Sequence, residues 1–323
     1  MSLPWHPWQP VPPLPHAAAF TPSSLGELLD GGQAFRWTAL PESAFEGQWG
    51  EHHVRVRLAP NASGTLEFAA PLHADPAATA AALHFYLSGP PAAPDALPWR
   101  SDAHLAAAMA AFPGLRILRQ PFGETLLGFV CSATKQIPQI KQMQALLAAR
   151  HGRALNPVPS ALQTSNRPPQ TISQSLIDNI VFHRLPTWTE LAAVSESELR
   201  ACSLGFRARH VAAIARFLAE NPGWLEATEH APYSEAKASL ITLQGVGEKV
   251  ADCVLLFGAG RLEAFPVDTW ILKALARRYD LAGWKPAQVA HFGRTHFGPQ
   301  AGLAQQYLFA YERAAARGKL TSP

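Results

Sequence analysis

The residues best suited to chemistry lie in the stretch Ser239–Phe257, which reads SLITLQGVGEKVADCVLLF. Two apolar patterns with helical spacing flank the turn residues Gly245, Val246 and Gly247. Glycine adopts backbone angles that are closed to other residues, so we expect a very tight turn between two helices. The second helix then begins at Glu248 with free backbone N–H groups at its start.

Such a hairpin predicts a grip on the backbone of DNA. Free N–H groups and the positive end of the helix dipole suit a phosphate oxygen, and such contacts position DNA without reading its sequence. We therefore predict DNA contacts at Gly245, Val246 and Gly247. The alternative is an ordinary pair of helices with glycine at the bend, which the run L-x-G-V-G-x-K-V-A disfavours.

The second residue of the predicted helix, Lys249, is a candidate nucleophile. An amine acts in this way when it is neutral and desolvated, and a nearby carboxylate then steadies the cationic intermediate. Asp268 is a carboxylate of the required kind, and it stands where the helix Thr269–Tyr279 should begin. Asp268 should cap that helix, which would fix its rotamer. Lys249 contacting phosphate and Asp268 serving only as a cap are the simpler alternatives.

These residues must be positioned by a fold that we predict to be α+β. A Pro- and Trp-rich tail (1–20) precedes an N-terminal α+β domain (21–115), which carries a small antiparallel sheet. A larger helical domain (116–323) follows, with a Pro-rich insertion at 155–170. Strands are expected within Gln33–Thr38, Phe45–Trp49 and His53–Leu58. Helices are expected at Leu25–Leu29, Ala103–Ala111, Glu124–Cys131, Ile140–Ala149, Gln174–Val181, Ser197–Cys202, Arg209–Glu220, Ser234–Ile241, Glu248–Phe257, Thr269–Tyr279 and Gly302–Ala316.

Composition limits the remaining classes of protein. Of the 323 residues, 48% are hydrophobic and 16% charged, which is typical of a folded, core-rich protein. The net charge of +3 permits a nucleic-acid partner without requiring one. Cys131, Cys202 and Cys253 lack the C-x-x-C spacing of zinc or iron–sulfur sites, so we expect neither cofactor. Without an evident signal peptide or membrane span, we expect a cytoplasmic, monomeric protein that is associated with the nucleoid through DNA and is not secreted.

The chain resembles the 8-oxoguanine DNA glycosylase family of the helix-hairpin-helix glycosylase superfamily over about residues 23–315. The hairpin, Lys249 and Asp268 carry the resemblance to the superfamily. The closer likeness to the family rests on four further segments, which are Gly32–Trp37, Phe112–Ser132, Leu204–Val211 and Gly298–Phe309. The resemblance implies a small sheet-containing domain joined to a helical glycosylase domain. It also implies double-stranded DNA with a damaged base as the partner.

The resemblance implies a bifunctional enzyme that removes the base and cleaves the strand. Lys249 would attack C1′ of the damaged nucleotide and form a Schiff base, and Asp268 would stabilise the positive charge that develops. The carbonyl of Gly32 would accept the N7–H that 8-oxoguanine has and guanine lacks. Gln305 would read the Watson–Crick edge, and Phe309 and Cys253 would sandwich the ring. A buried core cysteine is the simpler interpretation of Cys253.

Further DNA contacts are implied at Phe206, which would fill the gap left by a flipped base, and at Arg207, which would contact the opposite base. A solvated arginine beside a helix-start aromatic is the simpler interpretation. The resemblance also implies a structural monovalent cation at the hairpin. The backbone carbonyls of Ile241, Leu243 and Val246 would hold it.

Three departures from the family pattern bear on specificity. Ala133–Gln136, which includes the expected DNA contact Thr134, replaces an asparagine-containing run. Gln139 stands where the family has a second arginine, and a neutral amide cannot supply the guanidinium fork. Trp270 stands in place of a phosphate-contacting histidine. We therefore expect a relaxed preference for the base opposite the lesion.

Two other functions remain open on sequence alone. A glycosylase for alkylated bases, of the 3-methyladenine type, would release its base without cleaving the strand, and relatives of that type generally lack the hairpin lysine. A non-enzymatic helix-hairpin-helix module would bind DNA through the turn and leave Asp268 and Gln305 without a role.

Overall fold

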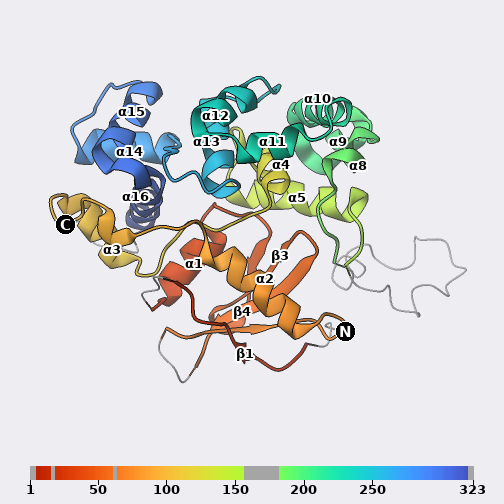
Figure 1. Cartoon of the computed structure of the whole chain (residues 1–323), viewed down its shortest axis with the longest axis horizontal. Coiled ribbons are helices and arrows are strands. Elements are labelled where there is room, and N and C mark those ends of the chain that lie inside the picture. Colours follow the sequence, from red (N-terminus) through yellow and green to blue (C-terminus); the bar gives the residue numbers. More distant parts are fainter. Residues whose placement is uncertain (1–4, 16–18, 61–63, 156–181, 319–323) are drawn as a thin grey trace, which may run out of the picture.

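The computed structural model describes residues 5–15, 19–60, 64–155 and 182–318. The expected helix Gln174–Val181 and all but the first residue of the expected insertion at 155–170 lie outside these ranges. The described chain is α+β, as predicted. Figure 1 shows the sheet and its flanking helices in one half of the molecule and a larger group of helices in the other.

The sheet is antiparallel throughout and has the strand order β1-β5-β4-β3-β2. Its strands are β1 (Gln9–Pro10), β2 (Trp37–Ala39), β3 (Ala44–Trp49), β4 (His52–Leu58) and β5 (Leu66–Ala69). In β4, Val54 and Val56 are fully buried while the side chains of Arg55 and Arg57 remain partly exposed. The alternation of apolar and basic residues therefore predicted the two faces of this strand.

Within the segment predicted as a tail (residues 1–20), the described part adds a short edge strand, β1, to β5. Proline has no backbone N–H to donate to a neighbouring strand. It is tolerated in an edge strand, because one side of that strand has no partner. The tail also covers the basic face of β4. The guanidinium carbon of Arg55 lies 4.3 Å from the ring centroid of Trp5, and that of Arg57 lies 4.2 Å from Trp8. The tryptophans thus shield a charged strand face by cation–π contacts.

Two helices, α1 (Pro22–Asp30) and α2 (Pro76–Ser88), pack on the sheet, and a third, α3 (Ala103–Ala111), packs against α16 (Ala301–Ala316). The first and third were predicted, and α2 was missed because the helical pattern was expected only after Pro98. A local signal was present, since Asp75 accepts hydrogen bonds from Ala77 and Ala78 at the start of α2 and Pro76 is its first residue.

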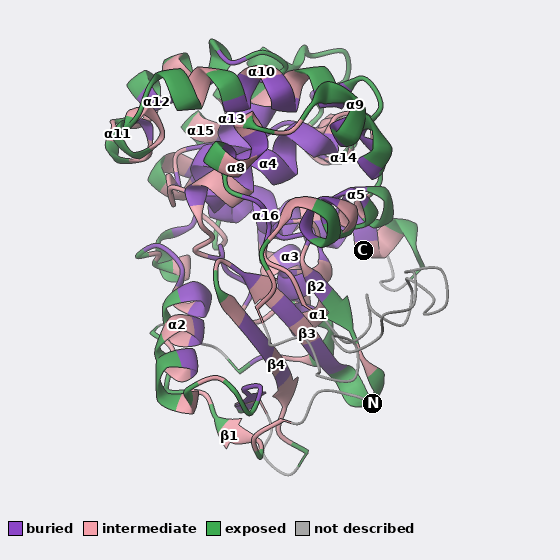
Figure 2. Cartoon of the chain, turned by 90° about the vertical axis from the view of Figure 1, so that its right-hand side faces the viewer, coloured by how far each residue is buried: buried purple, intermediate pink, exposed green. Residues whose placement is uncertain are grey.

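The remaining helices build the second half of the molecule (Figures 1 and 2). They are α4 (Phe122–Ser132), α5 (Ile137–His151), α8 (Trp188–Ala192), α9 (Glu196–Leu199), α10 (Arg207–Glu220), α11 (Trp224–His230), α12 (Tyr233–Ile241), α13 (Glu248–Phe257), α14 (Thr269–Arg278), α15 (Pro286–Phe297) and α16 (Ala301–Ala316). Short 3₁₀ turns cover Pro41–Ser43, Pro94–Ala96 and Gly298–Gln300.

Several helical segments differ from prediction. The expected helix Ser197–Cys202 is a short α-helix, α9, that continues as a π-helical turn over Arg200–Leu204. Helices α8, α11 and α15 were not predicted. The first two are shorter than eight residues, so they carry too little periodicity to be recognised.

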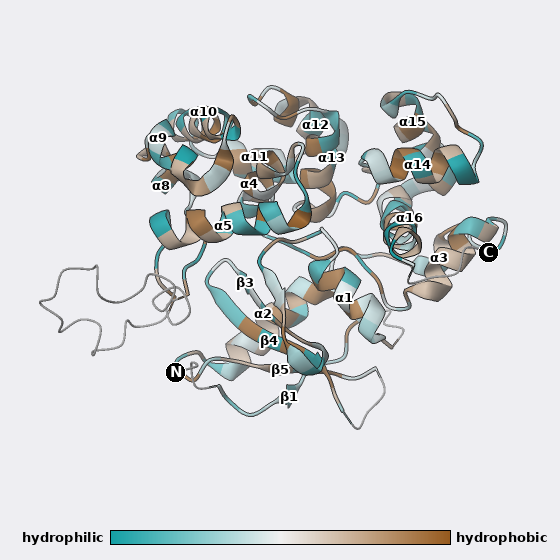
Figure 3. Ribbon diagram, turned by 180° about the vertical axis from the view of Figure 1, so that it is seen from behind, coloured by the Kyte–Doolittle hydropathy of each residue, from teal (hydrophilic) through white to brown (hydrophobic). Residues whose placement is uncertain are grey.

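The core of the helical half is built around α4 and α13, which pack against each other. Every residue of α13 from Val250 to Phe257 is buried, and α4 is buried except at Gly123 and Glu124. The ribbon in Figure 3, coloured by hydropathy, shows hydrophilic residues on α9 and α10. Among the described helices, none combines the length and apolar character needed to span a membrane. The packing leaves the first turn of α13, which carries Lys249, at the edge of the core.

Candidate active site

The predicted hairpin is present, with α12 and α13 joined by the turn Thr242–Gly247. Gly245 has a φ of +86°, and a Cβ there would come within 2.3 Å of the His210 ring, so only glycine fits. Gly247 starts α13 without a side-chain cap. Gly245 and Gly247 are exposed while Val246 is buried, so the first N–H groups of α13 are available at the surface for a phosphate.

Lys249 is half-buried on the first turn of α13, with its ammonium nitrogen 5.4 Å from the centroid of the Phe129 ring. One helical turn further on, the buried thiol of Cys253 lies close enough to accept a hydrogen bond from the Lys249 side chain. Burial raises the pKa of Cys253 to about 12, the charge of Lys249 lowers it, and the charge of Asp268 raises it. Both charges therefore act on the same thiol, which means that the amine and the carboxylate share one site.

Asp268 caps α14 as predicted, and its Oδ1 accepts the backbone N–H of Ile271 at 2.9 Å. Burial raises the pKa of Asp268, while hydrogen bonds from the N–H groups of Ile271 and Trp270 and the charge of Lys249 oppose that rise. The cap thus fixes the rotamer of the carboxylate, and the start of the helix helps to keep it ionised. A rigid carboxylate beside an amine can stabilise a cationic intermediate.

The residues predicted to bind the base converge from the two ends of the chain. Gly32 has a φ of +115°, and a Cβ on it would lie 3.9 Å from Cε1 of Phe309. Gln305 is buried on α16 one turn before Phe309, and its Nε2 donates to the carbonyl of Pro266 at 3.1 Å. Its Oε1 is buried and has no partner among the described residues. A buried acceptor without a donor costs free energy of folding, so this oxygen is a candidate to accept a hydrogen bond from a ligand.

The predicted wedge and its neighbouring arginine have different environments. Phe206, just before α10, is 44% exposed, as a residue that enters a DNA duplex must be. Arg207 is only 2% exposed and turns inward. Its guanidinium donates to the carbonyls of Ala133 and Leu204 and to Oγ1 of Thr134. The structure therefore brings Arg207 and Thr134 together as a brace for the loop after α4.

The two remaining departures from the family pattern lie at the starts of helices. Gln139 is exposed in the first turn of α5, where its Oε1 accepts the N–H of Gln136 at 3.2 Å. Trp270 is half-buried in the first turn of α14, with the ammonium nitrogen of Lys273 5.7 Å from its ring centroid. An exposed amide and an indole stacked on a cation are both open to a partner.

The three carbonyls predicted to hold a cation have the chemistry that a monovalent ion requires. The carbonyl of Leu243 accepts one hydrogen bond, from the N–H of Val246 at 3.1 Å. No described donor bonds the carbonyls of Ile241 or Val246. Neutral oxygens with free lone pairs in a tight turn fit a sodium or potassium ion.

Four residues at the site were not singled out from the sequence. Phe129 of α4 forms the floor under Lys249, and His210 of α10 packs against Gly245. Arg313 of α16 and Glu27 of α1 form an ion pair beside Phe309. The spacing Phe309 to Arg313 was a usable signal, since residues four apart share a helix face. The ion pair of Glu27 and Arg313 could not be predicted from local sequence, because the two residues lie near opposite ends of the chain.

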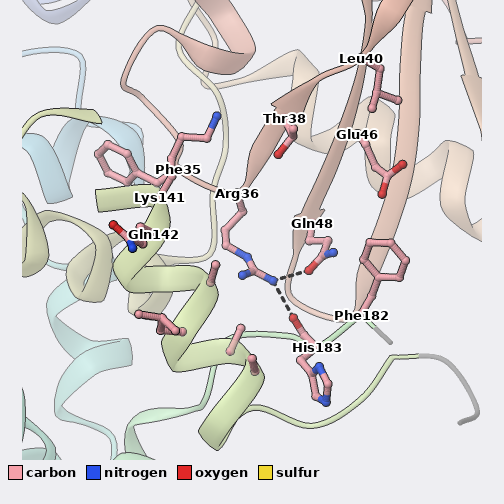
Figure 4. Close-up of a pocket in the computed structure, with 14 residues that line it drawn as sticks. Phe35, Arg36, Thr38, Leu40, Glu46, Gln48, Lys141, Gln142, Phe182 and His183 are labelled. Carbon is pink, nitrogen blue, oxygen red and sulfur yellow. Dashed lines mark hydrogen bonds between the residues drawn. The ribbon is translucent and has the colours of Figure 1, made fainter. Parts of the chain in front are cut away.

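A cavity of about 570 Å³ lies elsewhere, between the sheet and α5, and Figure 4 shows its lining. Arg36 crosses this cavity and donates to Gln48 and to the carbonyl of His183. Burial lowers the pKa of Arg36 to about 10. None of the predicted site residues lines this cavity, and its arginine is held in structural hydrogen bonds, so the geometry assigns the chemistry to Lys249.

Comparisons with known proteins agree with this geometry. The N-glycosylase/DNA lyase OGG1 of Arabidopsis thaliana is 30% identical over 308 residues, which cover 90% of this chain and 78% of that protein. The crystal structure of Clostridium acetobutylicum 8-oxoguanine glycosylase/lyase, in complex with dsDNA containing cytosine opposite to 8-oxoG, superposes with a TM-score of 0.77. It is 27% identical and covers 90% of this chain and 92% of that one. No family model matches the chain.

A more distant structure shares only the fold. The 3-methyladenine DNA-glycosylase from Archaeoglobus fulgidus superposes with a TM-score of 0.65 at 19% identity, and the match covers 93% of this chain and 97% of that one. The glycine turn, the lysine after it and the capping carboxylate define a helix-hairpin-helix DNA glycosylase. Within that class, the chain belongs to the N-glycosylase/DNA lyase family of OGG1.

Proposed function

We propose that this chain excises 8-oxoguanine from duplex DNA and then cleaves the strand at the abasic site. The observation that carries the proposal is the position of Lys249 on the first turn of α13, directly behind the glycine turn, and of Asp268 at the N-cap of α14, close enough that both charges act on the Cys253 thiol. A DNA clamp would not need a half-buried carboxylate beside that amine. Family membership supports the same conclusion.

In the proposed reaction the neutral amine of Lys249 attacks C1′ of the damaged nucleotide. The C1′–N9 bond breaks, and its electron pair leaves with the base, which takes up a proton. The attached amine and the opened sugar form a Schiff base, whose positive charge the carboxylate of Asp268 stabilises. Loss of a proton from C2′ then expels the 3′ phosphate by β-elimination.

Base recognition would use the two acceptors at the ends of the chain. The Gly32 carbonyl would accept the N7–H of 8-oxoguanine, whereas guanine would place a lone pair against it. The unpartnered Oε1 of Gln305 would accept a donor on the Watson–Crick edge. Phe309 and Cys253 would form the two walls of the base pocket, because the Phe309 ring lies near Gly32 and the Cys253 thiol lies near Lys249.

Duplex DNA would be held by the hairpin turn, with a monovalent cation on the carbonyls of Ile241, Leu243 and Val246. Phe206 would fill the gap in the stack, and Thr134 and Trp270 would lie along the backbone. Arg207 is engaged by the loop after α4 and Gln139 lacks a guanidinium, so opposite-base selectivity would be relaxed. We place this activity in the cytoplasm, with a monomer acting on nucleoid DNA.

The decisive test is borohydride trapping on a duplex that contains a single 8-oxoguanine. We expect the wild-type chain to form a covalent complex, and Lys249→Gln to reduce trapping and strand cleavage by at least about 10³-fold, because it removes the nucleophile. Lys285→Gln, which removes an exposed charge from the start of α15, is the matched control. Base release from methylated adenine without cleavage, or binding without any base release, would overturn the proposal.

A further inference from the structure

The guanidinium of Arg313 connects three parts of the proposed base pocket. Arg313 lies one turn after Phe309 on α16 and is only 5% exposed. Its Nη1 donates to Oε1 of Glu27 at 2.7 Å and to the carbonyl of Gly31. Its guanidinium carbon lies 5.1 Å from the centroid of the Phe309 ring. The side chain of Arg313 therefore contacts Glu27 of α1, the carbonyl of Gly31 and the Phe309 ring.

The carbonyls on both sides of Gly32 are anchored while its own is not. Arg313 holds the carbonyl of Gly31, and Nε2 of Gln120 donates to the carbonyl of Gln33 at 2.7 Å. No donor among the described residues bonds the carbonyl of Gly32. The carbonyls of Gly31 and Gln33 belong to the peptide planes on either side of the Gly32–Gln33 peptide. Because both flanking planes are anchored, the orientation of the free Gly32 carbonyl between them is restricted.

The buried charge of Arg313 also reaches the catalytic carboxylate. Burial lowers the pKa of Arg313, and the nearby carboxylates of Glu27 and Asp268 raise it. The same charge lowers the pKa of Asp268. Glu27 therefore supplies a hydrogen-bond acceptor, and above about pH 7 a counter-charge, to a cation that would otherwise be isolated in the core between α1 and α16.

We propose that Arg313, held by Glu27, is a positioning residue that sets the selectivity of base release by orienting the Gly32 carbonyl and the Phe309 ring. The inference rests on the proposed function, because Gly32 and Phe309 recognise a base only if this site excises one. Arg313 itself touches neither substrate nor reacting atoms. Its charge is the weakest of the influences described for the pKa of Asp268, so its main effect falls on the steps in which a base must be recognised.

The experiment compares two reactions of one protein: base release from 8-oxoguanine and strand cleavage at a preformed abasic site. The variants are Arg313→Met, Arg313→Lys and the double variant Glu27→Leu with Arg313→Met, which leaves no unpaired charge and should fold where a single variant does not. We expect the double variant to lose about tenfold or more in single-turnover base release while its abasic-site cleavage stays within about twofold. Arg313→Lys should retain an intermediate rate, because an ammonium can hold one carbonyl.

The matched control is the neighbouring pair of Arg278 and Glu312, which is equally buried between α14 and α16. Arg278→Met should leave the ratio of the two rates unchanged. An unchanged base-release rate in the folded double variant, or an equal fall of both rates, would overturn the role in recognition. If the wild-type chain cleaves abasic sites but releases no 8-oxoguanine, the proposed function fails first, and that result is separate.

Discussion

The two sides of the site are built in opposite ways. The side that we propose to be catalytic, called the catalytic side below, comes from neighbouring stretches of chain, with Lys249 and Cys253 on α13 and Asp268 at the start of the next helix. The recognition side joins the two ends of the chain, with the Gly31–Gly32 loop after α1 and the buried face of α16. A chemical motif can therefore be local even when the pocket that it serves is not.

Each side also has one half-buried carboxylate beside a cation, and the comparison shows what a helix start contributes. Asp268 receives backbone N–H bonds at the start of α14 as well as the charge of Lys249. Glu27 has Arg313 but no backbone donor, and burial raises its pKa to about 7. Backbone donors stabilise the ionised carboxylate at the place where the reaction generates positive charge. On the recognition side the carboxylate serves only to hold a side chain.

The largest effect that tests this contrast is expected for Asp268→Asn. Asparagine caps a helix as well as aspartate does, so α14 should keep its stability while the site loses its negative charge. We expect single-turnover base release to fall by about 10²-fold or more, with little change in the thermal unfolding midpoint. Asp102 caps α3 in the same way, so Asp102→Asn is the control and should keep its excision rate. A large fall in the unfolding midpoint together with the rate would show that Asp268 acts mainly as a cap.

The sequence predicted the catalytic side well because its signals are local. The double-glycine turn, the helix that starts at Glu248 and the cap at Asp268 are all present where they were expected. The edge strand β1 and the Glu27–Arg313 pair were missed, since both depend on contacts between distant parts of the chain. Arg207 was predicted to face DNA because it follows Phe206, whereas the carbonyls of Ala133, in the loop after α4, and of Leu204, just before α10, accept its hydrogen bonds and hold it inward. The residues that form a turn can be recognised from the local sequence, whereas the partners of a long side chain depend on distant parts of the fold.

The next largest expected effect is on the free energy of unfolding, through the titration of Glu27 on the recognition side. Because the pKa of folded Glu27 is about 7 and its usual value is 4.5, the folded chain holds an extra proton between these values. The stability that this proton provides is present below about pH 4.5 and is lost as the pH rises through about 7. We therefore expect the free energy of unfolding of the wild type, relative to Glu27→Gln, to fall by up to about 3 kcal/mol over that window.

Urea unfolding of both proteins at several pH values measures this difference, in which the other titrating groups cancel. A difference that is flat with pH, or that grows toward neutrality, would show that Arg313 keeps Glu27 ionised throughout. The recognition side would then resemble the catalytic side in its electrostatics, and the contrast between the two carboxylates would be lost.

The smallest effect is expected at Gln139, which lies on neither wall and faces the strand opposite the lesion in the proposed function. An unpaired cytosine presents two adjacent acceptors, O2 and N3, that match the guanidinium fork, whereas adenine places a donor beside its acceptor. We expect Gln139→Arg to raise the ratio of base release opposite cytosine to that opposite adenine by about fivefold.

The control is Gln142→Arg, which adds the same charge to α5 and should leave that ratio unchanged. Single-turnover rates opposite all four bases decide the matter. A uniform change for every opposite base would mean that the added arginine acts on phosphate alone, and that opposite-base selectivity resides elsewhere, in the loop that Arg207 now braces.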